Sequence, residues 1–121
     1  MAVTRYVVEN VDRSIRFYAD HFGFELQQRY GPFVAVMGAG DQTVWLSGPR
    51  SSAGQRTEDG AQPEPGGWSR IVLEVQDLAA EVDRLRAGGV RFRGEAVKGP
   101  AGSWVLLEDD SGNPIELFQP A

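Results

Sequence analysis

An internal repeat restricts the possible folds of this chain more than any other feature of its sequence. A polar residue followed by three regularly spaced apolar residues occurs twice, first as Asn10, Val11, Ile15 and Tyr18, and then, at an offset of 67 in the numbering, as Asp77, Leu78, Val82 and Leu85. Asn and Asp are favoured helix N-cap residues, and this apolar spacing forms one stripe of an amphipathic helix. Glycine follows each helical pattern, as Gly23 and as the pair at 88–89, and is typical of helix ends.

Short apolar segments bounded by turn residues predict one strand before each helix and three after it. The predicted strands lie at 3–8, 25–30, 33–37 and 42–47 in the first copy, and at 68–75, 90–97, 103–108 and 114–119 in the second. In the last strands the offset between copies is 71, which maps Phe33 onto Trp104 and Trp45 onto Glu116. The sequence therefore predicts an α+β fold of two βαβββ repeats in one domain, with repeat one at 1–47 and repeat two at 68–121.

The segment at 48–67 joins the two repeats and has no periodicity. It is rich in Gly, Pro, Ser and charged residues. This composition is typical of a connecting loop. The sequence leaves open whether the segment is a plain connector or a lid over a binding cleft.

The net charge argues against several classes of partner. The formal net charge of −5 argues against nucleic acid and anionic membrane surfaces, and mildly favours a neutral or cationic small ligand. A solvated acidic surface is the simpler explanation of the same charge. The chain has no cysteine, no apolar run long enough to span a membrane and no signal-peptide pattern at its N-terminus, so we expect a cytoplasmic location.

The segments at 10–18, 22–24, 75–80 and 110–117 resemble the vicinal oxygen chelate superfamily, which includes glyoxalase I, extradiol dioxygenases, bleomycin-resistance proteins and fosfomycin-resistance proteins. The resemblance covers nearly the whole chain apart from 48–67. It implies that each repeat forms a curled mixed sheet, that the sheets surround a cleft with the helices outside, and that the protein is a homodimer. The resemblance specifies the fold strongly and the chemistry weakly, because one fold hosts many functions.

The enzymes of that superfamily bind a divalent metal through four side chains, usually His, Gln or Glu. The resemblance places these positions at Val3, Trp45, Arg70 and Glu116. Only Glu116 can coordinate a metal, and Arg70 would add a permanent positive charge to the same pocket. The single histidine, His21, lies at a helix end. We therefore predict a protein without a metal or other cofactor.

Strand alternation predicts which side chains face the cleft. The candidate ligand-binding residues are Arg5, Phe33, Met37, Trp45, Trp68, Arg70, Trp104, Glu116 and Phe118. Aliphatic residues of the same strands, such as Leu46 and Ile115, are expected to face the helices. Aromatic residues are equally common in cores and interfaces, but five of them opposite the aliphatic core favour a small-molecule site. We expect Arg70 and Glu116 to form an ion pair in the floor of the cleft.

Three classes of function remain open from the sequence. The first is a binding protein, similar to bleomycin-resistance proteins, that sequesters an aromatic or cationic small molecule. The resemblance implies an antibiotic-resistance role for such a protein. The second is an enzyme, either an isomerase or lyase that uses Glu116 as an acid or base, or a metal-dependent dioxygenase. The third is an interaction module whose cleft is filled by its own side chains or by a partner.

Overall fold

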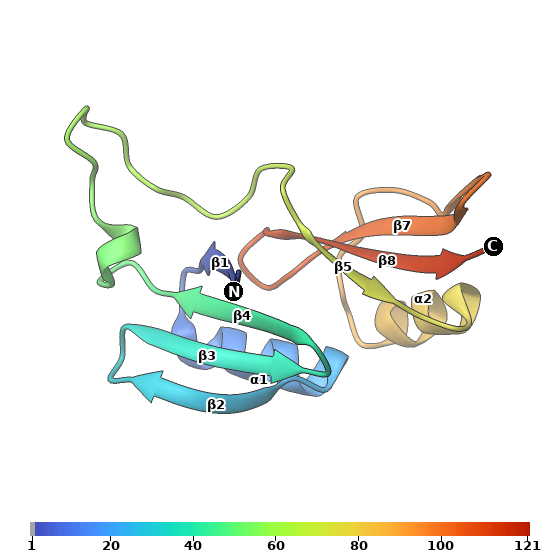
Figure 1. Ribbon diagram of the computed structural model, residues 1–121, viewed down its shortest axis with the longest axis horizontal. Helices are drawn as coiled ribbons and strands as arrows, with labels where there is room; N and C mark the ends of the chain where they lie inside the picture. Colours follow the sequence, from blue (N-terminus) through green and yellow to red (C-terminus); the bar gives the residue numbers. More distant parts are fainter. Residues whose placement is uncertain (1) are drawn as a thin grey trace. The chain divides into compact units, whose positions relative to one another are not determined.

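The computed structural model describes residues 2–121 and divides into two compact units, Met1–Gly66 and Gly67–Ala121 (Figure 1). Each unit contains one α-helix and one four-stranded sheet. Within the described residues, no helix is long and apolar enough to cross a membrane.

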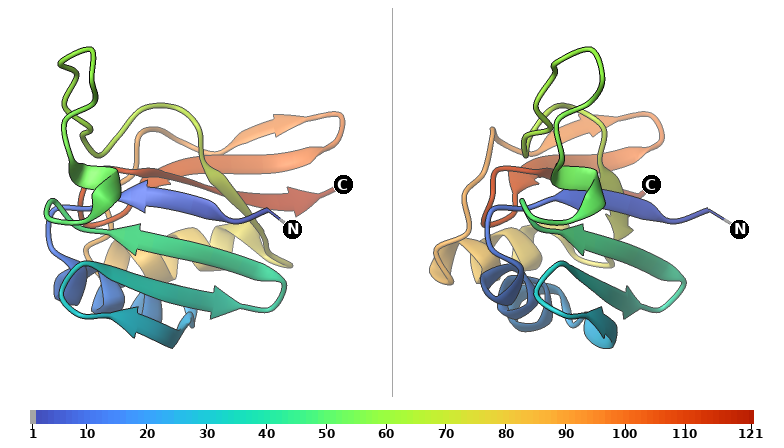
Figure 2. Two further views of the ribbon diagram at one scale, coloured as in Figure 1. Left: turned by 60° about the vertical axis from the view of Figure 1, so that its left-hand side comes forward. Right: turned by 90° about the vertical axis from the view of Figure 1, so that its left-hand side faces the viewer.

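The first unit has the predicted strand–helix–strand–strand–strand order. Its elements are β1 (Thr4–Val7), α1 (Val11–Phe22), β2 (Glu25–Tyr30), β3 (Val34–Ala39) and β4 (Gln42–Ser47). The sheet order is β1-β4-β3-β2, with β1 parallel to β4 and the other neighbours antiparallel. α1 packs against β2, β3 and β4 and covers one face of this sheet (Figure 2).

The second unit repeats this topology. Its elements are β5 (Ile71–Glu74), α2 (Leu78–Ala87), β6 (Val97–Gly99), β7 (Gly102–Glu108) and β8 (Pro114–Pro120). The sheet order is β5-β8-β7-β6, and β5 is parallel to β8. Thr4 pairs with Val44 in the first unit, and Ile71 pairs with Ile115 in the second, so the offsets of 67 and 71 are both found in the strand register. The predicted α+β fold of two βαβββ repeats is confirmed.

Both helices begin at the predicted caps. The side chain of Asn10 accepts a hydrogen bond from the Arg13 N–H at 2.9 Å, and that of Asp77 accepts one from the Ala80 N–H at 3.1 Å. α1 ends at Gly23, whose φ of 69° is left-handed and therefore favours glycine.

Replacing Asn10 with Ala should lower the free energy of unfolding by about 1 kcal/mol, because a helix N–H loses its partner. Urea denaturation followed by circular dichroism measures this change. Asn10→Asp keeps an acceptor in the same place and should retain most of the stability. An equal loss in both variants would contradict a capping role.

The core of each unit lies between its helix and its sheet. In the first unit it includes Tyr18, Phe24, Val44 and Leu46, and in the second Leu85, Val105, Leu107, Ile115 and Leu117. Each of these side chains is at most 2% exposed. The predicted helix-facing positions of the last strands are therefore buried, and Trp45, Glu116 and Phe118 lie on the other face of each sheet.

The prediction for the third strand of the first repeat is wrong by one position. Met37 pairs with Val44, and Leu107 pairs with Ile115. The offset in numbering is 70 from Met37 to Leu107 but 71 from Val44 to Ile115, so the offset of 71 does not hold for β3 and β7. A shift of one position exchanges the two faces of a strand. Phe33 consequently does not correspond to Trp104.

Two predicted strands are shorter than expected. The first strand of the second repeat begins at Ile71 and leaves Trp68 and Arg70 before it. The predicted strand at 90–97 reduces to an isolated bridge between Phe92 and Leu107, and β6 begins only at its last residue.

The segment at 48–67 is locally ordered by its own hydrogen bonds. It contains a 3-10 helix at Ser52–Gly54, and the Ser51 hydroxyl donates to the Gly48 carbonyl at 2.7 Å. Farther along, the Thr57 hydroxyl and the Ala61 N–H both donate to the Asp59 carboxylate, and these hydrogen bonds lower the pKa of Asp59.

Candidate functional site

The second sheet carries a charged pair in the middle of its open face, the face opposite α2. Glu116 lies in β8 and is paired with Val72 of β5 on one side and Leu106 of β7 on the other. Its neighbours in the strand, Ile115 and Leu117, are buried on the helix side. The alternation of β8 therefore directs the Glu116 carboxylate to the open face.

Arg70 binds Glu116 through two nitrogens. Its Nε and Nη2 donate to Oε1 of Glu116 at 3.1 and 2.8 Å, and its Nη1 donates to the Trp68 carbonyl at 3.2 Å. The side chains are 27% and 15% exposed, so the pair is largely shielded from water. The predicted ion pair is confirmed. Within residues 2–121, no group donates a hydrogen bond to the other carboxylate oxygen, Oε2.

Aromatic and apolar side chains share this face with the pair. Trp104 of β7 is paired with Phe118 of β8 and with Val97 of β6, so all three share the open face. The Arg70 guanidinium carbon lies 6.0 Å from the centre of the Trp104 ring, within the range of a cation–π contact. Val72 and Val97 are 41% and 45% exposed. The structure thus brings the predicted residues Arg70, Trp104, Glu116 and Phe118 onto one face.

Trp68 lies outside the strands and contacts Arg93, which was not among the predicted site residues. It is 72% exposed, and the Arg93 guanidinium carbon lies 5.0 Å from its ring centre. Arg93 also donates to the Gly67 carbonyl at 2.9 Å, the Gly112 carbonyl at 3.0 Å and Glu108 at 2.8 Å. Arg93 lies in an irregular segment after α2, where alternation gives no guide to side-chain direction.

The open face of the first sheet carries a different arginine–aromatic pair. Arg5 of β1 is paired in register with Trp45 of β4, and its guanidinium carbon lies 4.7 Å from the Trp45 ring centre. Val36 of β3 is the other partner of Trp45. Within residues 2–121, no carboxylate forms an ion pair with Arg5.

Two predicted residues do not lie on this open face. Met37 is fully buried on the helix side, where its partner Val44 is also fully buried, so its assignment to the cleft was wrong. Phe33 precedes β3 and contacts Arg50. The guanidinium carbon of Arg50 lies 5.5 Å from the centre of the Phe33 ring. The cause for both is the one-position shift in β3.

The family's metal positions do not fit a metal centre here. Val3 and Trp45 offer no ligand atom, and the only carboxylate, Glu116, is hydrogen-bonded to the cation of Arg70. Among the residues described, no group of three or more His, Cys, Asp or Glu side chains is arranged to hold a metal ion. We therefore derive no chemistry through a metal, and the metal-free interpretation remains a prediction.

Known structures share the fold of this chain. A lactoylglutathione lyase from Agrobacterium tumefaciens is 19% identical, with a TM-score of 0.76 over 98% of this chain and 92% of that one. The fosfomycin resistance protein FosX from Listeria monocytogenes is 13% identical, with a TM-score of 0.75 over 100% and 93%. A glyoxalase/bleomycin resistance protein/dioxygenase from Nocardioides is 21% identical, with a TM-score of 0.72 over 99% and 83%. Such low identities establish the fold alone.

No curated protein sequence matches the chain. A family model does match, and it covers residues 1–117. This match agrees with the repeat, the topology and the motifs at the helix starts and in the last strand. The chain belongs to the Glyoxalase/Bleomycin resistance protein/Dioxygenase superfamily.

Proposed function

We propose that the protein binds a small aromatic or cationic organic molecule on the open face of the second sheet. The observation that carries this proposal is the Arg70–Glu116 pair, which shares its face with Trp104, Phe118, Leu106 and exposed valines, and with Glu74 and Glu108 toward the ends of the strands. Apolar surroundings with a few fixed polar groups are typical of small-molecule sites.

The geometry suggests how such a ligand would be held. Trp104 offers a flat surface for an aromatic ring or a cation. Arg70 fixes one oxygen of Glu116, and the other oxygen remains able to accept a hydrogen bond from an amine or hydroxyl of the ligand. Sequestration needs no catalytic group, so drug binding or resistance is consistent with these residues.

Replacing Arg70 with Met should weaken ligand binding about tenfold, because Glu116 loses the donor that orients it. The ligands are a panel of aromatic and cationic antibiotics, and the readout is quenching of tryptophan fluorescence. Arg84→Met is the matched control, because Arg84 is exposed and pairs with Glu81 on α2. Unchanged affinity in Arg70→Met would remove Arg70 from the site.

Elemental analysis of the same protein tests the metal-free proposal, because stoichiometric bound metal would contradict it.

A second candidate function is an isomerase or lyase that uses Glu116 as acid or base. The observation that favours it is Oε2 of Glu116, which accepts no hydrogen bond from any of residues 2–121. A carboxylate in such a place can move a proton next to a carbonyl group. Glu116→Gln distinguishes the two proposals, because it would abolish turnover in an enzyme while a binding protein has no turnover to lose.

We also propose a homodimer, because β2 and β6 each end a sheet, and an edge strand presents backbone groups with which a second chain can pair. Light scattering of the purified chain measures its mass in solution. A monomer at all concentrations would exclude this assembly. If no antibiotic in the panel binds, the interaction module becomes the better explanation of the open face.

A further inference from the structure

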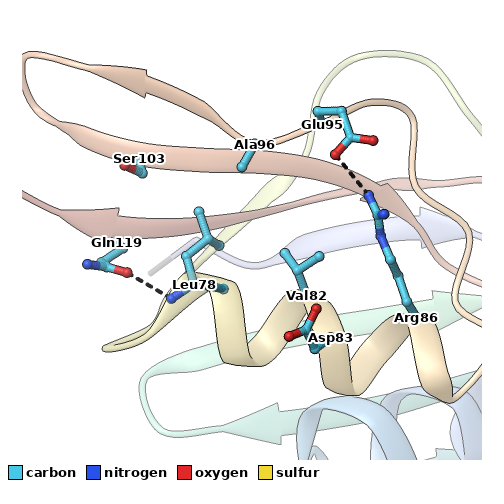
Figure 3. Close-up of a pocket in the computed structure, with 9 residues that line it drawn as sticks. Leu78, Val82, Asp83, Arg86, Glu95, Ala96, Ser103 and Gln119 are labelled. Carbon is cyan, nitrogen blue, oxygen red and sulfur yellow. Dashed lines mark hydrogen bonds and ion pairs between the residues drawn. The ribbon is translucent and has the colours of Figure 1, made fainter.

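The second unit contains a cavity on the opposite side of its sheet from Arg70 and Glu116. Its volume is about 430 Å³, and it lies between α2 and the ends of β7 and β8 (Figure 3). The lining residues are Leu78, Ala79, Val82, Asp83, Arg86, Glu95, Ala96, Ser103 and Gln119. Ser103 and Gln119 form a register pair in phase with the buried pair Val105 and Leu117, so they face the helix.

The first repeat explains why this space exists. Its equivalent of the Ser103–Gln119 pair is Phe33 and Gly48, which are joined by a hydrogen bond from the Gly48 N–H to the Phe33 carbonyl. Gly48 lies so close to α1 that an added Cβ would be 2.9 Å from Cγ2 of Val11. In the second repeat a long side chain occupies the glycine position, and Gln119 Oε1 accepts a hydrogen bond from the Leu78 N–H at 2.7 Å.

The helix–sheet layer of the second repeat also lacks the aromatic residues of the first. In the first unit, Phe17 and Tyr18 have ring centres 5.6 Å apart, and Tyr18 and Phe24 have ring centres 5.5 Å apart. At the positions of Phe17 and Tyr18, which the offset of 67 identifies, the chain has Arg84 and Leu85, and Val90 follows the left-handed Gly89 as Phe24 follows Gly23. Smaller buried side chains thus replace the rings of Tyr18 and Phe24, and the exposed Arg84 replaces the half-buried Phe17. In the wall of the cavity itself, Ser103 and Gln119 stand where the first repeat has Phe33 and Gly48.

The walls of the cavity combine apolar and polar groups. Leu78 is only 4% exposed, and Figure 3 shows it pointing with Val82 from α2 toward the sheet. Glu95 binds Arg86 at 3.3 Å at one end of the cavity. The Asp83 carboxylate forms no ion pair or hydrogen bond with any of residues 2–121, so it is the uncompensated charge of the lining.

We infer that this cavity is a second binding site, which takes a small amphipathic amine. The apolar part of the ligand lies against Leu78, Val82 and Ala96, and its ammonium group pairs with Asp83. A volume of about 430 Å³ is within the range of small-molecule sites. This site is separate from the open face and does not depend on the function proposed there.

The test uses the ¹⁵N-labelled full chain and three probes that share one apolar group: 4-phenylbutylamine, 4-phenylbutan-1-ol and 4-phenylbutanoate. The amine is expected to shift the amide signals of Leu78, Val82, Ser103 and Gln119 in a saturable way, and to bind more tightly than the alcohol and the acid. Shifts centred on Val72 and Trp104 would overturn the proposal, because they report the open face. Equal binding of the acid and the amine would overturn it as well.

Two kinds of substitution then locate the ligand. Ser103→Phe restores the residue of the first repeat and should weaken amine binding at least about tenfold by filling the cavity. Ala96→Leu fills the same space from another wall and decides the question if Ser103→Phe does not fold. Asp83→Asn should weaken amine binding about threefold and leave the alcohol unaffected, since exposed ion pairs are weak. Glu81→Gln makes the same charge change on α2 outside the cavity and should have no effect. Unchanged amine affinity in the folded cavity-filling variants would overturn the proposal.

Discussion

Replacing Arg93 with Met is expected to lower the free energy of unfolding by about 3 kcal/mol, the largest effect of any single arginine in the chain. Arg93 and Glu108 are 19% and 18% exposed, and their hydrogen bond is 2.8 Å long. The same guanidinium holds the carbonyls of Gly67 and Gly112. The substitution removes all these donors at once and leaves a shielded carboxylate without its main partner. Urea denaturation followed by circular dichroism measures the loss.

Arg91→Met is the matched control for this experiment. Arg91 also approaches Glu108, at 3.8 Å, but its side chain is 82% exposed. An exposed pair of this length contributes little, so the variant should unfold within about 0.5 kcal/mol of the parent protein. Similar losses in both variants would show that general charge around Glu108, rather than the buried contacts of Arg93, stabilises this region.

Replacing Asp109 with Ala is expected to lower the free energy of unfolding by about 2–3 kcal/mol. Asp109 is 5% exposed at the start of the turn between β7 and β8. Its Oδ1 accepts hydrogen bonds from the Ser111 and Asn113 N–H groups, each at 2.9 Å, and its Oδ2 accepts one from Asn113 Nδ2 at 3.1 Å. Without the carboxylate, these buried donors lose their partners. A thermal or urea unfolding curve measures the change.

The first repeat provides the control for this turn. Asp41 lies in the equivalent connection between β3 and β4, is exposed, and forms no hydrogen bond with the described residues. Asp41→Ala should therefore leave stability nearly unchanged.

A mutation in the Asp109 turn is also expected to affect the open face, because this turn leads into β8 and so sets the register of Glu116. If Asp109→Ala were as stable as Asp41→Ala, the hydrogen bonds of Asp109 would not hold the turn.

The contacts of Arg93, the Asp109 turn and the two proposed binding sites all lie in the second repeat. The repeats share their topology but differ where side chains meet the sheet. The position that carries Glu116 in the second repeat carries Trp45 in the first. Likewise, on the face that meets the helix, Ser103 stands where the first repeat has Phe33, and Gln119 stands where it has Gly48. The second sheet therefore carries polar groups on both of its faces.

Much of the fold is predictable from the sequence because its signals are local. Asn10 and Asp77 cap the helices that follow them, and Gly23 ends the first of them. The apolar alternation of 114–119 gives the correct faces for Ile115, Leu117 and Glu116. The order of the strands within each sheet is known only from the structure, where both copies have the same order. Arg70 was predicted beside Glu116 from these signals and the family resemblance.

The face assignment in β3 could not be obtained in this way. Phe33, Val34, Ala35, Val36 and Met37 are all apolar, so alternation has no polar residue that marks one side. Only the hydrogen-bonded register with β4 establishes that Met37 faces the helix. The offset between repeats led to the wrong phase because it was transferred from β4 and β8, and the pairing of β3 and β7 differs by one position.

Local patterns and the repeat are sufficient to predict the duplicated βαβββ frame and the helix caps and, with the family resemblance, the ion pair between Arg70 and Glu116. The contacts of Arg93 and the cavity beneath α2, in contrast, arise only in the folded chain. Arg93 joins Gly67, Glu108 and Gly112, which are distant along the chain. The cavity depends on how closely a helix approaches a sheet, and that distance is set by the side chains that meet between them rather than by any local pattern.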